Sequence, residues 1–221
     1  MYHSTAADPG LPVNVTPDLL SEHLRFLQRR GKRCCSVRAL LAGEPGCDLA
    51  LTFDDGYANN LDILPVLADF QAGATFFVLT GGEGETLSHH QPRHVPLMGR
   101  RGWRTLHDAG FEVAAHGHSH RRLTELSVAE QEQEIAGSIQ TLRETLGVAS
   151  VGYAYPYGAM DPSSHLLAKE YSEYACATRY RNPLKEDRWR LRRINISAAD
   201  EGRRFGLKTG TPFRLLCDLG C

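Results

Sequence analysis

Leu49-Ala50-Leu51-Thr52-Phe53-Asp54-Asp55-Gly56 is the stretch that best indicates how this chain folds. A short apolar run that ends at a glycine is typical of a strand buried on both faces. The carboxyl ends of such strands usually carry the functional groups of α/β proteins, and two aspartates stand at this one. Since side chains alternate along a strand, Asp54 and Asp55 should have different roles unless the chain has already begun to turn. An ordinary Asp-Asp-Gly surface turn is the alternative interpretation.

A histidine cluster follows a second predicted strand, which covers residues 111–115. His116 and His120 can face one point if the chain turns helically between them, and neutral imidazole is the commonest protein ligand for transition metals. One carboxylate and two imidazoles leave coordination positions open for water and substrate. We therefore predict a catalytic metal site formed by Asp55, His116 and His120. A solvated histidine-rich loop is the alternative.

Together these motifs resemble those of the polysaccharide deacetylase family, also called the NodB-homology or carbohydrate esterase 4 group. Thr52-Phe53-Asp54-Asp55-Gly56 matches its first motif, and His116 to Leu123 matches its second, His-x3-His-x2-Leu. Residues 74–78 match the strand between them, and Tyr153 to Gly158 resembles the third motif. Even Met1-Tyr2-His3 is similar to the Tyr-His that closes the first strand in one branch. The resemblance covers most of the chain and implies one catalytic domain over residues 1–221, with an α/β fold of the distorted (β/α) barrel type.

The resemblance also implies a reaction, the removal of acetyl groups from an N-acetylated sugar, polysaccharide or glycolipid-linked sugar. Zn²⁺ would be the metal, although Co²⁺, Ni²⁺ and Fe²⁺ also suit the donor set. Such an ion lowers the pKa of bound water and polarises the acetyl carbonyl. Asp54 would then act as the general base, and the backbone N–H of Tyr157 would stabilise the oxyanion. The expected substrate-binding residues are Pro156, Tyr157, Trp189 and Arg193.

Two family features are missing from the sequence. Ala154 stands where the family has an arginine that orients the catalytic aspartate, although Arg192 or Arg193 could replace it from a neighbouring strand. The late Leu-x-His motif that supplies the general acid is absent, because no histidine follows His165. We expect His3 to be the acid, since a first strand ending there would place it at the same rim as Asp54. His118 is the second candidate.

Composition bounds the other classes of function. With 221 residues, 42% hydrophobic and 23% charged, the chain can bury a sizeable core, and no second domain is needed. A formal net charge of −1 argues against an electrostatic nucleic-acid binder, since neutralising phosphates takes a local excess of Lys and Arg. No stretch is long or apolar enough to span a bilayer, and the start lacks a signal-like pattern. We therefore expect a soluble, cytoplasmic protein whose six cysteines are free thiols. The sequence does not predict its oligomeric state.

Two rival functions stay open at this stage. Two histidines and one carboxylate also suit an Fe(II) oxygenase, but a second aspartate beside the first fits hydrolysis better. A carbohydrate-binding relative without turnover would explain the missing arginine and the missing late histidine.

Other patterns predict the elements around the site. Helices should begin at Thr16-Pro17, at the capping box Ser127–Glu130 and at Asp161-Pro162. Late strands are expected over 174–178 and 191–196, and residues 81–96 should form a long loop at the rim of the site.

Overall fold

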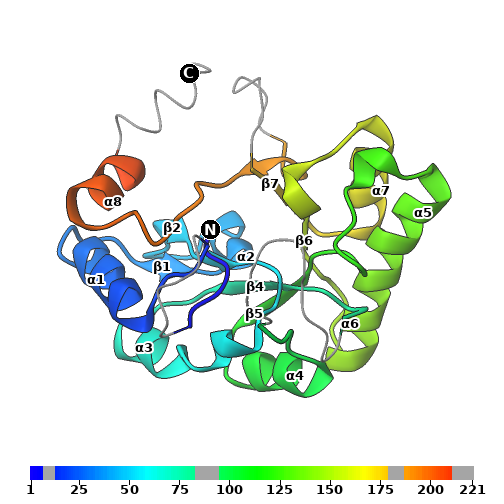
Figure 1. Cartoon of the computed structure of the whole chain (residues 1–221). Helices are drawn as coiled ribbons and strands as arrows, with labels where there is room; N and C mark the ends of the chain where they lie inside the picture. Colours follow the sequence, from blue (N-terminus) through cyan, green and yellow to red (C-terminus); the bar gives the residue numbers. More distant parts are fainter. Residues whose placement is uncertain (7–12, 83–94, 179–186, 211–221) are drawn as a thin grey trace.

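A parallel sheet of six strands forms the centre of the protein, with strand order following chain order from β3 to β8. The computed structural model describes residues 1–6, 13–82, 95–178 and 187–210. The sheet curls, and helices cover its outer side (Figure 1). This arrangement confirms the predicted α/β class and distorted barrel. The strands are β3 (Thr52–Phe53), β4 (Thr75–Val78), β5 (Glu112–Ala115), β6 (Tyr153–Ala154), β7 (Ala175–Ala177) and β8 (Leu191–Arg192).

The N-terminal residues close the curled sheet. Tyr2 bridges Phe53 in a parallel sense, and its backbone N–H donates to the Thr52 carbonyl at 2.8 Å. On the other side, the Ile196 N–H donates to the Met1 carbonyl at 2.9 Å. Residues 1–2 therefore lie between β3 and the chain that follows β8. Because His3 comes next, it reaches the rim at which β3 ends, as predicted.

The apolar run before the two aspartates is divided into two short strands. Its first part is β2 (Leu49–Ala50), which pairs with β1 (Cys34–Cys35) in a separate two-stranded sheet. Leu51 lies at the change of partner, since its N–H donates to Cys35 while its carbonyl accepts from Thr75. The continuous strand expected there is therefore wrong in detail. The part that reaches the aspartates, β3, is buried as expected.

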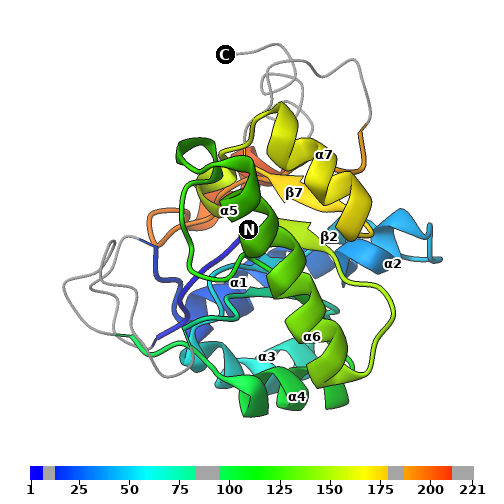
Figure 2. The same cartoon turned by 90° about the vertical axis from the view of Figure 1, so that its right-hand side faces the viewer.

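Helices lie on both flanks of the sheet, with α1 and α8 on one flank and α5, α6 and α7 on the other (Figures 1 and 2). Their bounds are α1 (Pro17–Gln28), α2 (Val37–Leu41), α3 (Leu64–Asp69), α4 (Arg100–Asp108), α5 (Val128–Glu132), α6 (Ser138–Leu146), α7 (Pro162–Tyr171) and α8 (Gly202–Thr209). Short 3₁₀ turns are η1 (Ala58–Leu61), η2 (Leu123–Glu125) and η4 (Pro156–Gly158).

The predicted helix starts are confirmed by side-chain caps. Thr16 accepts from the Leu19 N–H at 3.2 Å, and Ser127 and Glu130 form both bonds of a capping box. Asp161 caps α7 in the same way. The helix that begins at Ser127 contains a π turn, η3 (Gln133–Gly137), between α5 and α6, which periodicity did not predict.

The late strands are shorter than predicted. β7 occupies the centre of the expected segment 174–178, but β8 covers only the first two residues of 191–196. Beyond Arg192 the chain bonds to Met1 instead of β7, so the ladder ends there. Most of the predicted loop at 81–96 lies outside the described residues.

The expectation of free thiols is wrong for two cysteines. Cys35 and Cys47 form a disulfide across 12 positions of sequence, whereas Cys34 and Cys176 are free and buried. Adjacent cysteines cannot easily bridge each other, but Cys35 faces the segment that enters β2. Cys217 and Cys221 lie outside the described residues. Among the described helices, none has the length and hydrophobicity needed to cross a bilayer.

Removing the Cys35–Cys47 bond should lower the free energy of unfolding by about 3 kcal/mol. The reason is that closing a loop of this size reduces the conformational entropy of the unfolded chain by about that amount. Cys47→Ser is suitable because Cys47 is only half-buried. Denaturant unfolding with and without reductant measures the difference. Reductant should destabilise the wild type and leave the variant unchanged. Equal sensitivity of the two proteins would contradict the assignment.

Candidate functional site

Three predicted ligands meet at the carboxyl ends of β3 and β5. The Oδ1 atom of Asp55 lies 3.3 Å from Nε2 of His116 and 3.3 Å from Nε2 of His120. All three side chains are buried, and their ligand atoms lie within 4.8 Å of one another. Only β4 separates the two strands in the sheet, so parallel strand ends bring residues 55 and 116 together. The predicted set is therefore assembled by the fold.

The backbone reaches this arrangement through left-handed conformations. Asp55 has φ +72° and His120 has φ +60°, in a region that non-glycine residues seldom occupy. Residues 116–120 do not form the helical turn that was considered as the way to bring the two imidazoles together; Gly117, with φ +88°, and His120 reverse the chain instead. Such conformations cost about 1–3 kcal/mol each and persist where surrounding contacts over-determine them. Their concentration on two candidate ligands supports a functional role.

A backbone carbonyl selects the tautomer of His116. The Nδ1–H of His116 donates to the Ala154 carbonyl at 2.8 Å, because a carbonyl can only accept. In the neutral ring, Nε2 is then the atom with a free lone pair, and it faces Asp55. A bond from the far nitrogen to a carbonyl is the usual support of a metal-binding histidine. Ala154 thus contributes through its backbone carbonyl, a role that residue type could not predict.

The second aspartate has a different partner. Arg193 holds Asp54 in a bidentate pair, with N–O distances of 2.5 Å to Oδ1 and 2.7 Å to Oδ2. Both side chains are buried, and the guanidinium also lies over the Phe77 ring. Of the two arginines considered as replacements for the missing one, it is Arg193 that contacts the carboxylate. Arg193 was also expected to bind substrate, but the structure places its guanidinium on Asp54.

Both carboxylates are held in the ionised form. Burial alone would raise the pKa of Asp54, but the charges of Arg193 and His116 bring it below its usual value. For Asp55, burial is opposed by the imidazoles of His116 and His120 beside it, and its pKa falls well below the usual range. The two aspartates therefore carry negative charge at neutral pH, one facing the histidines and one facing the arginine.

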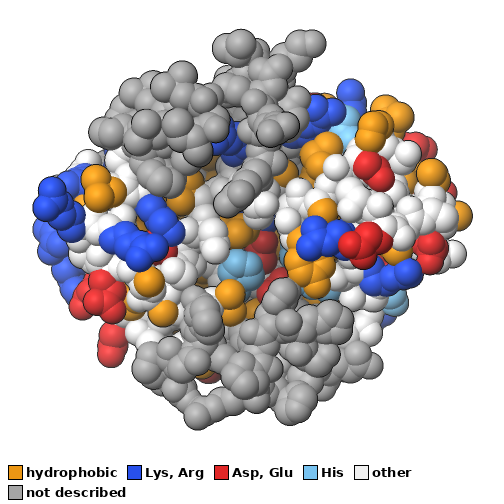
Figure 3. Space-filling view, turned by 45° about the horizontal axis from the view of Figure 1, so that its top comes forward, with side chains coloured by type: hydrophobic (Ala, Val, Ile, Leu, Met, Phe, Trp, Pro, Cys, Tyr) orange, Lys and Arg blue, Asp and Glu red, His pale blue; other side chains and the backbone are white. Residues whose placement is uncertain are grey.

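A pocket opens onto these groups and is also lined by His3, Tyr57, Tyr155, Tyr157 and Asn195. Histidine and acidic side chains come to the surface together near the middle of this face (Figure 3). The Nδ1 atom of His3 is buried and has no hydrogen-bond partner among the described residues. Burial lowers the pKa of His3, while Asp55 and Asp54 oppose that effect. An unpaired ring nitrogen in such a pocket is available to a bound molecule.

The other predicted residues are divided between this pocket and its surroundings. Tyr157 lines the pocket with φ +60°, and its ring centre lies 4.6 Å from that of His120. Pro156 begins the same turn but does not line the pocket. Trp189 is also outside the lining, because its indole N–H donates to the Ser172 carbonyl. His118 is exposed, with Nδ1 3.2 Å from the Thr80 hydroxyl, so it lies outside the pocket too.

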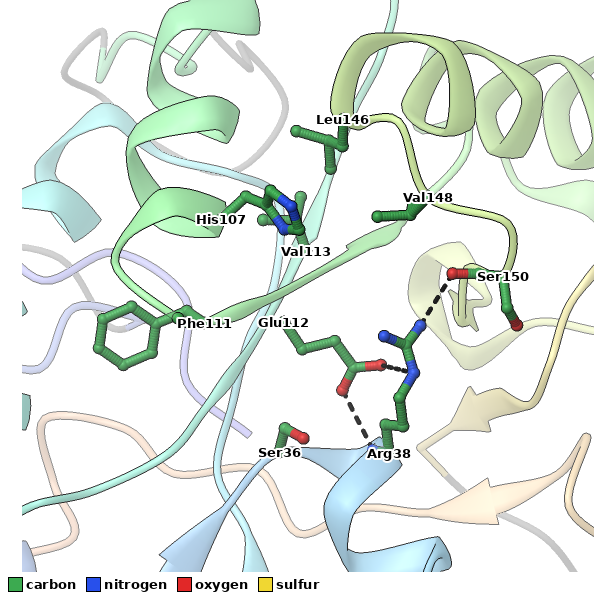
Figure 4. Close-up of a pocket in the computed structure, with 10 residues that line it drawn as sticks. Ser36, Arg38, His107, Phe111, Glu112, Val113, Leu146, Val148 and Ser150 are labelled. Carbon is green, nitrogen blue, oxygen red and sulfur yellow. Dashed lines mark hydrogen bonds and ion pairs between the residues drawn. The ribbon is translucent and has the colours of Figure 1, made fainter.

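A second pocket lies at the opposite end of β5 and is structural in character (Figure 4). Its buried Glu112 accepts from the hydroxyls of Thr75 at 2.6 Å and Tyr174 at 2.8 Å. Arg38 donates to Glu173 and to the Ser150 carbonyl. These charges are satisfied within the protein, and the pocket sits at the amino ends of the strands, where α/β folds seldom place chemistry.

The donor set fits a divalent transition metal. Two imidazoles and one carboxylate match catalytic sites of zinc and of related ions, which keep positions open for water and substrate. The support of His116 by a carbonyl is consistent with that use. Asp54 is not needed as a ligand, because Asp55, His116 and His120 already supply the three protein ligands of such a site.

Comparison with known proteins shows the family and the fold. The sequence pattern of the family described as polysaccharide deacetylase matches residues 43–174. The fold is similar to that of the deacetylase PplD from Streptococcus pyogenes, solved with acetate, at 23% identity and TM-score 0.78, covering 95% of this chain and 96% of that one. IcaB from Ammonifex degensii is similar at 20% identity and TM-score 0.74, with 90% and 91% covered.

A polysaccharide deacetylase from Bacillus cereus is similar at 20% identity and TM-score 0.76. There the match covers 93% of this chain but only 66% of the other. No curated protein matches the chain at a significant level.

Replacing His120 with alanine should abolish stoichiometric metal binding, because one of three protein ligands is lost. His118→Ala is the matched control, since His118 belongs to the same loop but is exposed. Metal content after dialysis against zinc measures both variants. If His120→Ala retained wild-type zinc affinity, the ligand assignment would be wrong.

Arg193→Ala should lower the free energy of unfolding by about 3–5 kcal/mol, since it leaves a buried carboxylate unpaired. Because the folded-state pKa of Asp54 is depressed, the stabilisation is present above the ordinary value of 3.8 and is lost as the pH falls through the lowered pKa. The gap between variant and wild type should therefore be widest near neutral pH. Arg192→Ala, at an exposed neighbour on β8, is the control and should change stability little. Equal losses in both variants would contradict the role of the pair.

Proposed function

Because the chain belongs to the polysaccharide deacetylase family, we propose that it is a metal-dependent hydrolase that removes acetyl groups from an N-acetylated sugar, polysaccharide or glycolipid-linked sugar. The observation that carries this proposal is the division of labour at the end of β3. Asp55 faces two histidines, and its neighbour Asp54 faces an arginine. A hydrolase of this kind needs one carboxylate to bind the ion and another to move a proton.

Asp55, His116 and His120 would hold the ion, which we propose is Zn²⁺. When bound there, it would lower the pKa of a water molecule and polarise the acetyl carbonyl as a Lewis acid. The bond from His116 to Ala154 keeps the coordinating nitrogen directed at the site.

Asp54 would take the proton from the attacking water. Its carboxylate is ionised at neutral pH, and each oxygen keeps a lone pair beyond the one that Arg193 engages. The bidentate pair also fixes the rotation of the carboxylate, which keeps the base oriented without a further ligand. Arg193 would thus do what the family's third-motif arginine does, from the chain that follows β8.

Two further residues complete the proposed reaction. The backbone N–H of Tyr157, in the turn that lines the pocket, would donate to the oxyanion that develops on the acetyl group. His3 would protonate the leaving amine, because its unpaired Nδ1 is buried beside the same pocket. The products are acetate and a free amine on the sugar.

The rival functions fit these contacts less well. A binding protein without turnover has no need of a buried arginine that orients a second aspartate, and Arg193 supplies what Ala154 lacks. In an Fe(II) oxygenase, a charged base beside the carboxylate ligand has no chemical role.

Acetate release from a panel of N-acetylated sugars and their oligomers tests the proposal. Release should require added Zn²⁺ or a similar ion and should stop when a chelator removes it. Asp54→Asn should keep its metal but lose about 10²–10⁴-fold in turnover, the usual contribution of a general base. If Asp54→Asn lost its metal together with its activity, Asp54 would be a metal ligand like Asp55 and not a separate base. No acetate from any acetylated sugar, in protein with bound metal, would contradict the proposed reaction.

A further inference from the structure

We propose that Glu134, a residue outside the three motifs, is a positioning residue that sets the geometry of the loop carrying His116 and His120. The inference rests on the proposed metal site and adds a residue to it. Glu134 lies in the π turn between α5 and α6, on the flank of the sheet that faces the viewer in Figure 2.

The carboxyl group of Glu134 binds the middle of the ligand loop. Its Oε2 accepts from the backbone N–H groups of His118, at 2.7 Å, and Ser119, at 2.9 Å. Its Oε1 accepts from the Ser119 hydroxyl. Glu134 is buried, with 6% of the residue exposed, whereas His118 and Ser119 lie at the surface. Three donors from two residues between the candidate ligands therefore converge on one side chain.

The opposite side of the loop is held by the segment after β4. The N–H of Thr80 donates to the Gly117 carbonyl at 3.2 Å, and that of Gly81 donates to the His118 carbonyl at 2.8 Å. The loop thus accepts bonds from one neighbour and donates bonds to the other. Since Thr80 and Gly81 use only its carbonyls, they cannot replace Glu134 as the partner of its N–H groups.

The helix is shaped to deliver this side chain. The Ser138 hydroxyl lies 2.6 Å from the Glu134 carbonyl and 2.9 Å from the Ile135 carbonyl, and it shares its one proton between these two acceptors inside the widened turn. π turns within helices occur frequently at functional sites. On the loop side, a Cβ at Gly117 would lie 3.0 Å from Oε2 of Glu134. The positive φ of Gly117 favours glycine there, and a Cβ would also crowd this carboxyl group.

The two ligands should not depend on Glu134 equally. His116 has its own supports, since its N–H donates to the Val78 carbonyl and its ring to the Ala154 carbonyl. His120 follows directly after the two residues that Glu134 binds, and it holds a left-handed conformation that needs surrounding contacts to persist. Loss of Glu134 should therefore displace His120 while His116 stays in place.

Metal binding tests the inference without reference to turnover. Glu134→Ala should weaken Zn²⁺ binding, measured by competition with a chromophoric chelator, by about 10- to 100-fold, the usual effect of losing a partner that orients a ligand. The absorption bands of bound Co²⁺ should also change, because one imidazole is displaced. Glu134→Gln should restore both properties, since its amide oxygen can accept the two backbone N–H groups. Glu134→Asp, one methylene shorter, should resemble alanine.

Glu132→Ala is the matched control. Glu132 lies two residues earlier in the same helix, but its carboxyl group accepts from the Tyr171 hydroxyl, away from the loop. It should leave zinc affinity and the Co²⁺ spectrum unchanged. If Glu134→Ala does not fold, the Gln and Asp variants still decide the matter through their opposite expected effects.

Wild-type affinity and an unchanged spectrum in Glu134→Ala, or in the folded Asp variant, would overturn the role of Glu134 and leave the metal site standing. A wild-type protein that binds no metal would instead overturn the proposed function, and this inference with it.

Discussion

A buried ion pair between Asp54 and Arg193 joins the first strand of the six-stranded sheet to the chain that leaves the last. Each partner is taken out of water only because the other is present, and removing one would leave an uncompensated charge. The same bond fixes the carboxylate that we propose as the base. Closure of the sheet and orientation of the base thus depend on one contact, which also explains why Asp54 and Asp55 can be neighbours without competing for the same partner.

Around this pair, the site is built as much by backbone as by side chains. Three residues of the proposed centre have positive φ: Asp55, His120 and Tyr157. This backbone conformation is unfavourable for non-glycine residues and persists only where surrounding contacts stabilise it. Main-chain groups provide much of the compensation, as when the Ala154 carbonyl orients His116. The backbone of the ligand loop is likewise hydrogen-bonded on both sides. Its carbonyls accept from the segment after β4, and its N–H groups donate to Glu134.

The sequence predicted the parts of this arrangement that depend on residue type and spacing. The acidic pair after an apolar run, the spaced histidines and the caps at Thr16 and Ser127 each have a local cause, and the structure contains them. What it could not predict depends on contacts between distant segments. The helical turn expected between His116 and His120 is a glycine-containing reversal, and the Cys35–Cys47 bridge needs the pairing of β1 with β2. Glu134 gave no signal, because an acidic residue in a helix is usually solvated.

The position of the arginine has a consequence for how the site depends on the fold. An arginine in the third motif would project from β6, near the middle of the sheet, whereas Arg193 follows β8 at its closing edge. Orientation of Asp54 therefore requires that the chain after β8 stays bonded to Met1 and, through Tyr2, to β3. Breaking these contacts of residues 1–2 would release the Asp54 carboxylate from Arg193. Asp55, His116 and His120 would be disturbed less, because they follow β3 and β5. In this protein the base should be more sensitive than the metal ligands to any change that opens the barrel.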